Sequence, residues 1–102
     1  MIIQVNYGDV EKTDAIDQYV HERVNKELAH FSNRITRVEV HLRDDNGSGK
    51  SGLKDKRCTM EARPAGHQPM AVEHAADSLH NAITDAAGKL SRVLRTTFDK
   101  AK

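Results

Sequence analysis

The 102-residue chain has one cysteine, two prolines, no tryptophan and few aromatic residues, which make up 4% of the sequence. A single cysteine excludes an internal disulfide framework and any zinc site built from several cysteines. No apolar run approaches the roughly 18 residues that a membrane-spanning helix needs, and the N-terminus lacks the pattern of a signal peptide. We therefore expect one small cytoplasmic domain over residues 1–102, without a membrane partner.

The residue patterns of common enzyme sites are also missing. The glycine-rich stretch at residues 47–51 is too short for a nucleotide-binding loop and follows no parallel strand–helix unit. Cys58 falls on the apolar side of an alternating segment, beside Met60, where a thiol acts as a small buried hydrophobe. The adjacent carboxylates Asp44 and Asp45 belong to a polar loop. The sequence thus predicts no enzymatic activity, no cofactor and no small-molecule substrate.

Six histidines raise the question of a metal site. His67, His74 and His80 lie close together in the sequence, but their spacing matches no zinc pattern and no cysteine ligands accompany them. We expect these three to be surface or capping residues, and we predict no metal site.

The net charge of +1 conceals a segregated distribution. Residues 1–33 and 64–85 are acidic, whereas residues 86–102 hold five bases and one acid. Such segregation is typical of a protein with a polyanionic partner.

Apolar periodicity predicts the order strand, helix, three strands, helix. Alternating residues indicate strands over residues 3–7, 37–43, 57–63 and 68–73. Pro69 favours either an edge position or a strand start for the last of them. Thr13 and Ser78 are good N-caps for helices that run to about residue 30 and to residue 98. These elements predict an α+β two-layer sandwich: a four-stranded, mainly antiparallel sheet with both helices on one face and the other face in solvent.

Basic residues gather on one flank of each predicted helix. At about 100° per residue, Lys89, Arg92 and Lys100 share a flank of the second helix, and Arg95 lies on its other side. On the first helix the shared flank holds Tyr19, Arg23, Lys26 and His30. If the flanks border a common groove, they form a band that can follow nucleic-acid phosphates. The alternative is two ordinary solvated helix faces, since Glu22 and Glu27 lie nearby.

Two segments carry a family resemblance: RITRVEVHL at residues 34–42 and AITDAAGKLSRVL at residues 82–94. Together with the element order, they resemble the ribosome hibernation-promoting factor and ribosome-associated inhibitor A family, also called the sigma-54 modulation protein family. The resemblance implies a fold like that of double-stranded RNA-binding domains. It also implies a non-enzymatic regulator that binds the small ribosomal subunit and its 16S rRNA and blocks the mRNA and tRNA channel under stress or in stationary phase.

The resemblance also suggests which residues contact rRNA. The family's basic positions fall on Arg23 and Lys26 of the first helix and, in the second, on Lys89, Arg92, Arg95 and Lys100. Tyr19 is a candidate for stacking on a base or ribose. The family's usual Asp-Met-Tyr opening of the second helix is replaced by residues 78–80, Ser-Leu-His. We expect a short form without a C-terminal dimerisation domain, and a monomer.

A second hypothesis is a protein-interaction module of the same fold. It would use the exposed sheet face or an edge strand, with cross-strand ion pairs among Arg37, Glu39, Arg57 and Glu61.

Overall fold

The computed structural model describes residues 1–45 and 55–100 of the chain. Its elements follow the predicted order: β1 (Ile2–Asn6), α1 (Asp14–Glu27), a short 3₁₀ helix η1 (Ala29–Arg34), β2 (Ile35–Asp44), β3 (Lys56–Pro64), β4 (Met70–Ala76) and α2 (Leu79–Lys100). The predicted polar loop at residues 44–52 lies largely outside the described residues, although Asp44 itself belongs to β2.

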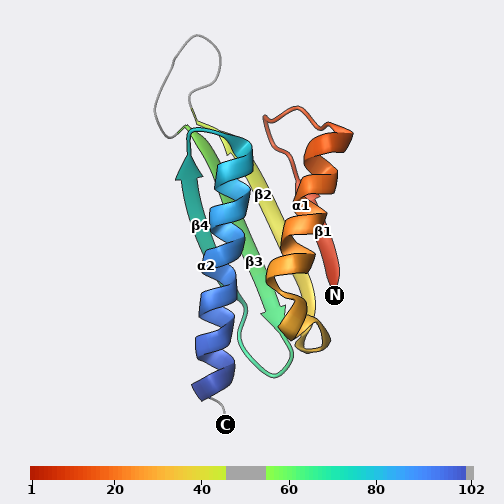
Figure 1. Cartoon of the computed structure of the whole chain (residues 1–102), viewed down its shortest axis with the longest axis vertical. Coiled ribbons are helices and arrows are strands. Elements are labelled where there is room, and N and C mark those ends of the chain that lie inside the picture. The colour runs from red at the N-terminus through yellow and green to blue at the C-terminus, as the bar shows by residue number, and fades with distance from the viewer. Residues whose placement is uncertain (46–54, 101–102) are drawn as a thin grey trace.

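The strands form one sheet in the order β1-β2-β3-β4 (Figure 1). The pairs β2–β3 and β3–β4 are antiparallel, whereas β1 and β2 are parallel. A parallel pair needs a crossover connection, and α1 provides it between these two strands. The prediction of a mainly antiparallel sheet is confirmed. The strand β4 (Met70–Ala76) lies at a sheet edge and starts directly after Pro69, in agreement with both alternatives for this proline.

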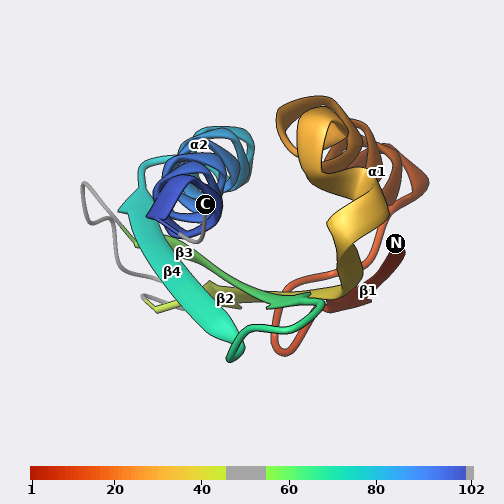
Figure 2. The same ribbon diagram turned by 90° about the horizontal axis from the view of Figure 1, so that it is seen from below.

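Both helices cover the same face of the sheet, and no helix of residues 1–45 or 55–100 lies on the opposite face (Figure 2). The helix α2 packs on β3 and β4, while α1 contacts β1 and α2. The apolar stripe of each helix meets the inward residues of the strands in one core, which includes Val20, Val24, Val38, Val40, Met60, Ile83, Leu90 and Leu94. Within the described residues, no helix is long and apolar enough to cross a membrane.

Both predicted N-caps are present. The Thr13 hydroxyl accepts a hydrogen bond of 3.1 Å from the Ile16 backbone N–H. The Ser78 hydroxyl accepts one of the same length from Asn81. Each bond satisfies a backbone donor that the first helical turn leaves without a partner. The caps therefore fix where each helix starts over the sheet.

The largest departures from the predicted boundaries are at the end of the first helix and in the last strand. The first helix ends at Glu27 rather than near residue 30, because Leu28 leaves helical geometry (φ −105°, ψ 16°) and the chain tightens into η1. This tighter turn still places Phe31 against Phe98, with the ring centroids 5.3 Å apart. The last strand is Met70–Ala76 rather than residues 68–73, because it stays paired with β3 as far as Lys56.

Candidate nucleic-acid interface

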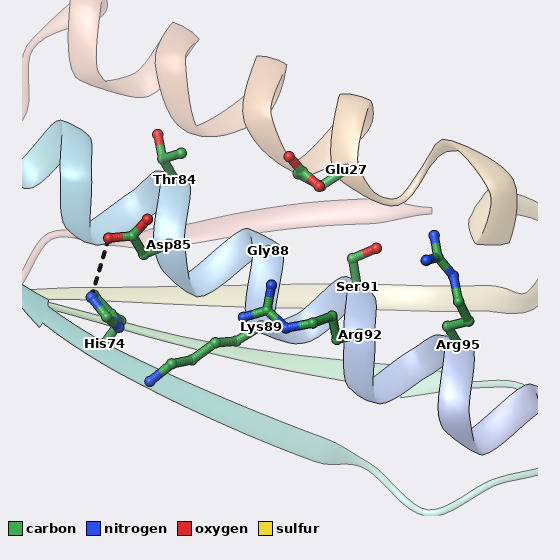
Figure 3. A pocket seen from close by; sticks show the side chains of 9 residues that line it. All are labelled: Glu27, His74, Thr84, Asp85, Gly88, Lys89, Ser91, Arg92 and Arg95. Carbon is green, nitrogen blue, oxygen red and sulfur yellow. Dashed lines mark ion pairs between the residues drawn. The ribbon is translucent and has the colours of Figure 1, made fainter.

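A hollow of about 660 Å³ opens on the helical side of the molecule. Most of its lining comes from α2, with Glu27 contributed by α1 and His74 by β4 (Figure 3). The two helices thus share one concave surface. The residues that line it are Glu27, His74, Thr84, Asp85, Gly88, Lys89, Ser91, Arg92 and Arg95.

Three of the predicted phosphate ligands, Lys89, Arg92 and Arg95, line this hollow together. The Lys89 Nζ donates a hydrogen bond of 3.0 Å to the backbone carbonyl of Glu73, at the edge strand β4. The side chains of Arg92 and Arg95 are exposed and form no ion pair anywhere in the described part of the chain. The second helix therefore presents two guanidinium groups that no carboxylate neutralises.

Two small residues of α2 lie among these bases. A Cβ built on Gly88 would lie in ordinary van der Waals contact with the Arg92 Nη1, at 3.7 Å. Ser91 is 7% exposed, and its hydroxyl points from α2 toward the side of α1 (Figure 3). The hollow thus combines two hydroxyl groups with three bases against two acids, and this excess of positive charge suits a phosphate group.

The first helix contributes an acid to the same hollow. The Arg23 Nη2 donates a hydrogen bond of 3.0 Å to the Glu27 Oε1, one helical turn away. The Arg23 Nε is buried and has no acceptor. A buried donor without a partner costs about 1–3 kcal/mol, so Arg23 is held by Glu27 in an incompletely satisfied position.

Tyr19 lies at the contact between the two helices. Its hydroxyl is 2.6 Å from the Thr84 Oγ1, and its ring meets His80 edge-on with the centroids 4.5 Å apart. Both polar and aromatic parts of this side chain are engaged within the protein. The geometry therefore gives Tyr19 a role in holding α1 against α2.

The predicted flanks are only partly brought together. Arg95, expected on the opposite side of the second helix, lines the hollow with Lys89 and Arg92. Lys26 and Lys100 are exposed, but neither lines the hollow. The sequence reasoning treated Glu27 as an ordinary solvated acid and overlooked Ser91. The spacing of Arg23 and Glu27 at i and i+4 was the available signal for their pairing.

The open face of the sheet is electrostatically different from the hollow. Each of its arginines has a carboxylate partner: Arg37 with Glu39, Arg43 with Asp45, Arg57 with Asp45 and Glu73, and Arg63 with Glu39 and Glu61. The hydrogen bonds from Arg57 hold the pKa of both Asp45 and Glu73 below their ordinary values. This face therefore carries positive and negative charge in equal measure.

Of the four residues expected to pair across strands, Arg37 and Glu39 pair with each other along β2, whereas Arg57 and Glu61 pair with other residues. Like charges stand directly opposite in the register, Arg37 beside Arg63 and Glu39 beside Glu61. Direct pairing across strands is thus unfavourable, and the contacts run diagonally or along one strand. Arg57 reaches Glu73 on β4, and Arg63 reaches Glu39 on β2 at 3.7 Å.

The histidines considered for a metal site occupy different surroundings. His74 belongs to β4, one residue beyond the predicted end of that strand, and its Nε2 is 3.2 Å from the Asp85 Oδ2. The ring of His67 meets that of Phe98, and the ring of His80 meets Tyr19. Among residues 1–45 and 55–100, no three potential ligands of the His, Cys, Asp and Glu types are grouped around a common point.

Cys58 is fully buried, as its place on the inward side of the strand predicted. Burial raises the pKa of its thiol to about 12. Because a thiolate rather than a thiol is the nucleophile, this side chain is unsuited to covalent catalysis at neutral pH.

Solved structures show the same fold. A ribosomal subunit interface protein from Coxiella burnetii superposes with a TM-score of 0.82 over 100% of both chains, at 17% identity. The N-terminal domain of Protein Y from Thermus thermophilus gives a TM-score of 0.77 at 23% identity, covering 95% of this chain and 99% of that domain. At such identities, these likenesses establish the architecture.

Sequence comparison extends the relationship. The chloroplast ribosome-binding factor PSRP1 of Spinacia oleracea is 28% identical over 92 residues, which cover 90% of this chain and 30% of that protein. The chain thus spans less than a third of this relative's length. A family model described as sigma 54 modulation protein / S30EA ribosomal protein matches residues 3–102. As the resemblance in the sequence predicted, the chain belongs to the sigma-54 modulation protein and S30EA ribosomal protein family.

Proposed function

We propose that this protein is a regulator of translation that binds the small ribosomal subunit through phosphates of its 16S rRNA. The observation that carries the proposal is the unneutralised cationic surface around the hollow, where Arg92 and Arg95 have no carboxylate partner in the described residues. The names of its relatives agree with this function, since one is a ribosome-binding factor and another is a ribosomal subunit interface protein.

The contrast between the two faces supports the helical face as the binding surface. A phosphate that binds Arg92 or Arg95 displaces only counterions, and this release favours association. A phosphate that binds the sheet face must compete with Asp45, Glu39 or Glu73 for arginines that are already paired. Binding on the helical side is therefore the more favourable arrangement.

Within this proposal, Lys89, Arg92 and Arg95 are the central phosphate ligands. Lys26 and Lys100 extend the cationic surface beyond the hollow, because both are exposed. Arg23 is a further phosphate ligand in this proposal, and in the free protein it is paired with Glu27. Tyr19 supports the surface by joining the two helices, and a stacking contact with RNA would need it to leave His80.

The mechanism we propose is steric occlusion. The protein has no catalytic step to perform: it occupies part of the mRNA and tRNA channel and excludes both ligands while bound. Control of translation under stress or in stationary phase then depends on the amount of protein and its affinity. Because phosphate contacts dominate such binding, its affinity depends strongly on salt.

Co-sedimentation with purified small ribosomal subunits tests binding at low and at raised salt. The wild type is expected to sediment with the subunits at low salt and to dissociate as salt increases. The double variant K89E/R92E is expected to stay in the supernatant while keeping its unfolding midpoint. Absence of wild-type binding, or indifference to the double substitution, contradicts the proposal.

Competition tests occlusion separately. Small subunits loaded with an mRNA and a tRNA are expected to bind less of the protein than empty subunits do. Subunits loaded with the protein are expected to bind less mRNA and less tRNA. Simultaneous binding of all three would leave subunit binding intact but exclude the occlusion mechanism.

The ion-paired sheet face favours a protein-interaction module as the second candidate function. Mixed, mutually paired charges suit a protein partner better than RNA, because a polyanion gains nothing from the acids. Cross-linking in a nuclease-treated lysate distinguishes the two candidates. A protein partner on the sheet survives the removal of RNA, whereas the ribosomal complex does not.

A further inference from the structure

The pairing of Arg23 with Glu27 lies between the cationic surface and the first helix. We propose that the Glu27 carboxylate occupies a further phosphate site, and that an RNA phosphate displaces it from Arg23 when the complex forms. This inference rests on the proposed function, because it assigns a competing group to the same surface.

The position of Glu27 is the first argument. It is the one residue of α1 that lines the hollow, whose opposite wall carries Arg92 and Arg95 (Figure 3). A carboxylate and a phosphate monoanion have similar oxygen acceptors and the same sign of charge. Glu27 thus provides on the protein the kind of group that the surrounding bases would bind on RNA.

The state of Arg23 is the second argument. Its guanidinium group has five N–H donors. One of its nitrogens, Nη2, donates to Glu27, and Nε is buried without an acceptor. The carboxylate therefore satisfies this group incompletely, and release from Glu27 lets the guanidinium turn toward a ligand with more oxygens.

The volume of the hollow beside Glu27 is the third argument, because about 660 Å³ leaves room for a phosphate group. Gly88 belongs to the same lining and adds no side chain to it. The Ser91 hydroxyl points into the hollow and forms no hydrogen bond within the described residues. Ser91 and Arg95 line the hollow together with Glu27 and therefore offer donors from α2, while Arg23 is connected to this place through its bond to Glu27.

The test compares E27Q with E22Q, using purified small ribosomal subunits as the probe. Both substitutions remove one negative charge from α1, but Glu22 contacts Gln18 and does not line the hollow. We expect E27Q to raise the affinity for the subunits about two- to fivefold, the size expected for one partly screened charge contact. E22Q is expected to change it less than about twofold.

A double-mutant cycle with R23Q tests whether Glu27 acts through Arg23. In the R23Q background, the gain from E27Q is expected to shrink to the size of that from E22Q. Thermal unfolding of every variant confirms that each is folded at the temperature of the binding measurement.

The inference is overturned if E27Q binds no more tightly than E22Q, if it binds more weakly than the wild type, or if its gain persists in full without Arg23. Each of these results, obtained with a wild type that binds, leaves the proposed function standing. Failure of the wild type and of E27Q to bind the subunits removes both proposals.

Discussion

The hydroxyls of Tyr19 and Thr84 lie 2.6 Å apart and join the two helices directly. One residue belongs to the middle of α1 and the other to the first half of α2. This bond and the edge-on contact of Tyr19 with His80 hold the helices together at one end of the hollow. The spacing of the basic side chains on the two helices depends on such contacts.

Tyr19→Phe removes this bond and keeps the ring. We expect the free energy of unfolding to fall by about 1 kcal/mol, the usual net contribution of one hydrogen bond. Affinity for small subunits is expected to stay within about twofold, because Phe retains the contact with His80. Urea unfolding and a binding titration measure the two quantities. A large loss of affinity at unchanged stability would show that the hydroxyl contacts RNA.

Lys89 and Arg92 are predicted to differ as phosphate ligands. The Lys89 amine already donates to the Glu73 carbonyl, whereas Arg92 has no such partner in the described residues. A phosphate must compensate for that bond at Lys89 but not at Arg92. Arg92→Ala is therefore expected to weaken subunit binding more than Lys89→Ala at the same salt concentration. The reverse order would mean that the bond to β4 is given up without cost.

Acid is expected to destabilise the protein through the sheet face. Hydrogen bonds from Arg57 lower the pKa of Asp45 and Glu73 below their ordinary values of 3.8 and 4.5. As the pH falls, the carboxylates of Asp45 and Glu73 therefore become protonated at a higher pH in the unfolded chain than in the folded protein. Their stabilisation is present above the ordinary values and is lost as the pH falls through the lowered ones.

Arg57→Gln removes the hydrogen-bond donor shared by the two acids. The decrease in unfolding temperature between about pH 5 and pH 3 should become smaller in this variant, because both folded-state pKa values return toward the ordinary range. Lys12→Gln is the control, since Lys12 pairs with neither acid. An equal decrease in Arg57→Gln and the wild type would contradict this role of Arg57.

Cys58 is predicted to be unreactive in the folded protein. Its side chain is fully buried, and its raised pKa keeps the thiol protonated at neutral pH. Labelling with a thiol reagent should therefore proceed only through unfolding, and its rate should rise with urea as the unfolded fraction rises. Rapid labelling in the absence of denaturant would show that the thiol is accessible.

Much of the fold follows from local patterns in the sequence. The caps at Thr13 and Ser78 and the apolar spacing of the helices depend on residues close in the chain, and the structure confirms both. The end of the first helix was misplaced because Leu28 and Phe31 continue the apolar stripe while the backbone changes to a 3₁₀ turn. Periodicity records which side is buried and does not distinguish these two geometries there.

The candidate site depends more on tertiary structure. One hollow is lined by Lys89, Arg92 and Arg95 together. This grouping depends on the curvature of the folded surface, which a helical wheel does not represent. The bond from Lys89 to Glu73 depends on the strand order, since only an edge strand next to α2 offers a free carbonyl there. The pair formed by Arg23 and Glu27 looks like any exposed i,i+4 pair until α2 is placed beside it.

Binding through the helical face is tested most directly by two variants, each of which lacks two arginines of one face. The variant R92Q/R95Q alters the helical face, and R43Q/R63Q removes the same charge from the sheet, where these two side chains are 65% and 52% exposed. We predict that the helical variant binds small subunits at least about tenfold more weakly than the wild type. The slope of its log affinity against log salt concentration should be less steep by about 1.5, as expected when two phosphate contacts are lost. The sheet variant should match the wild type in both measures. Equal losses in the two variants, or a loss confined to the sheet variant, would contradict binding through the helical face.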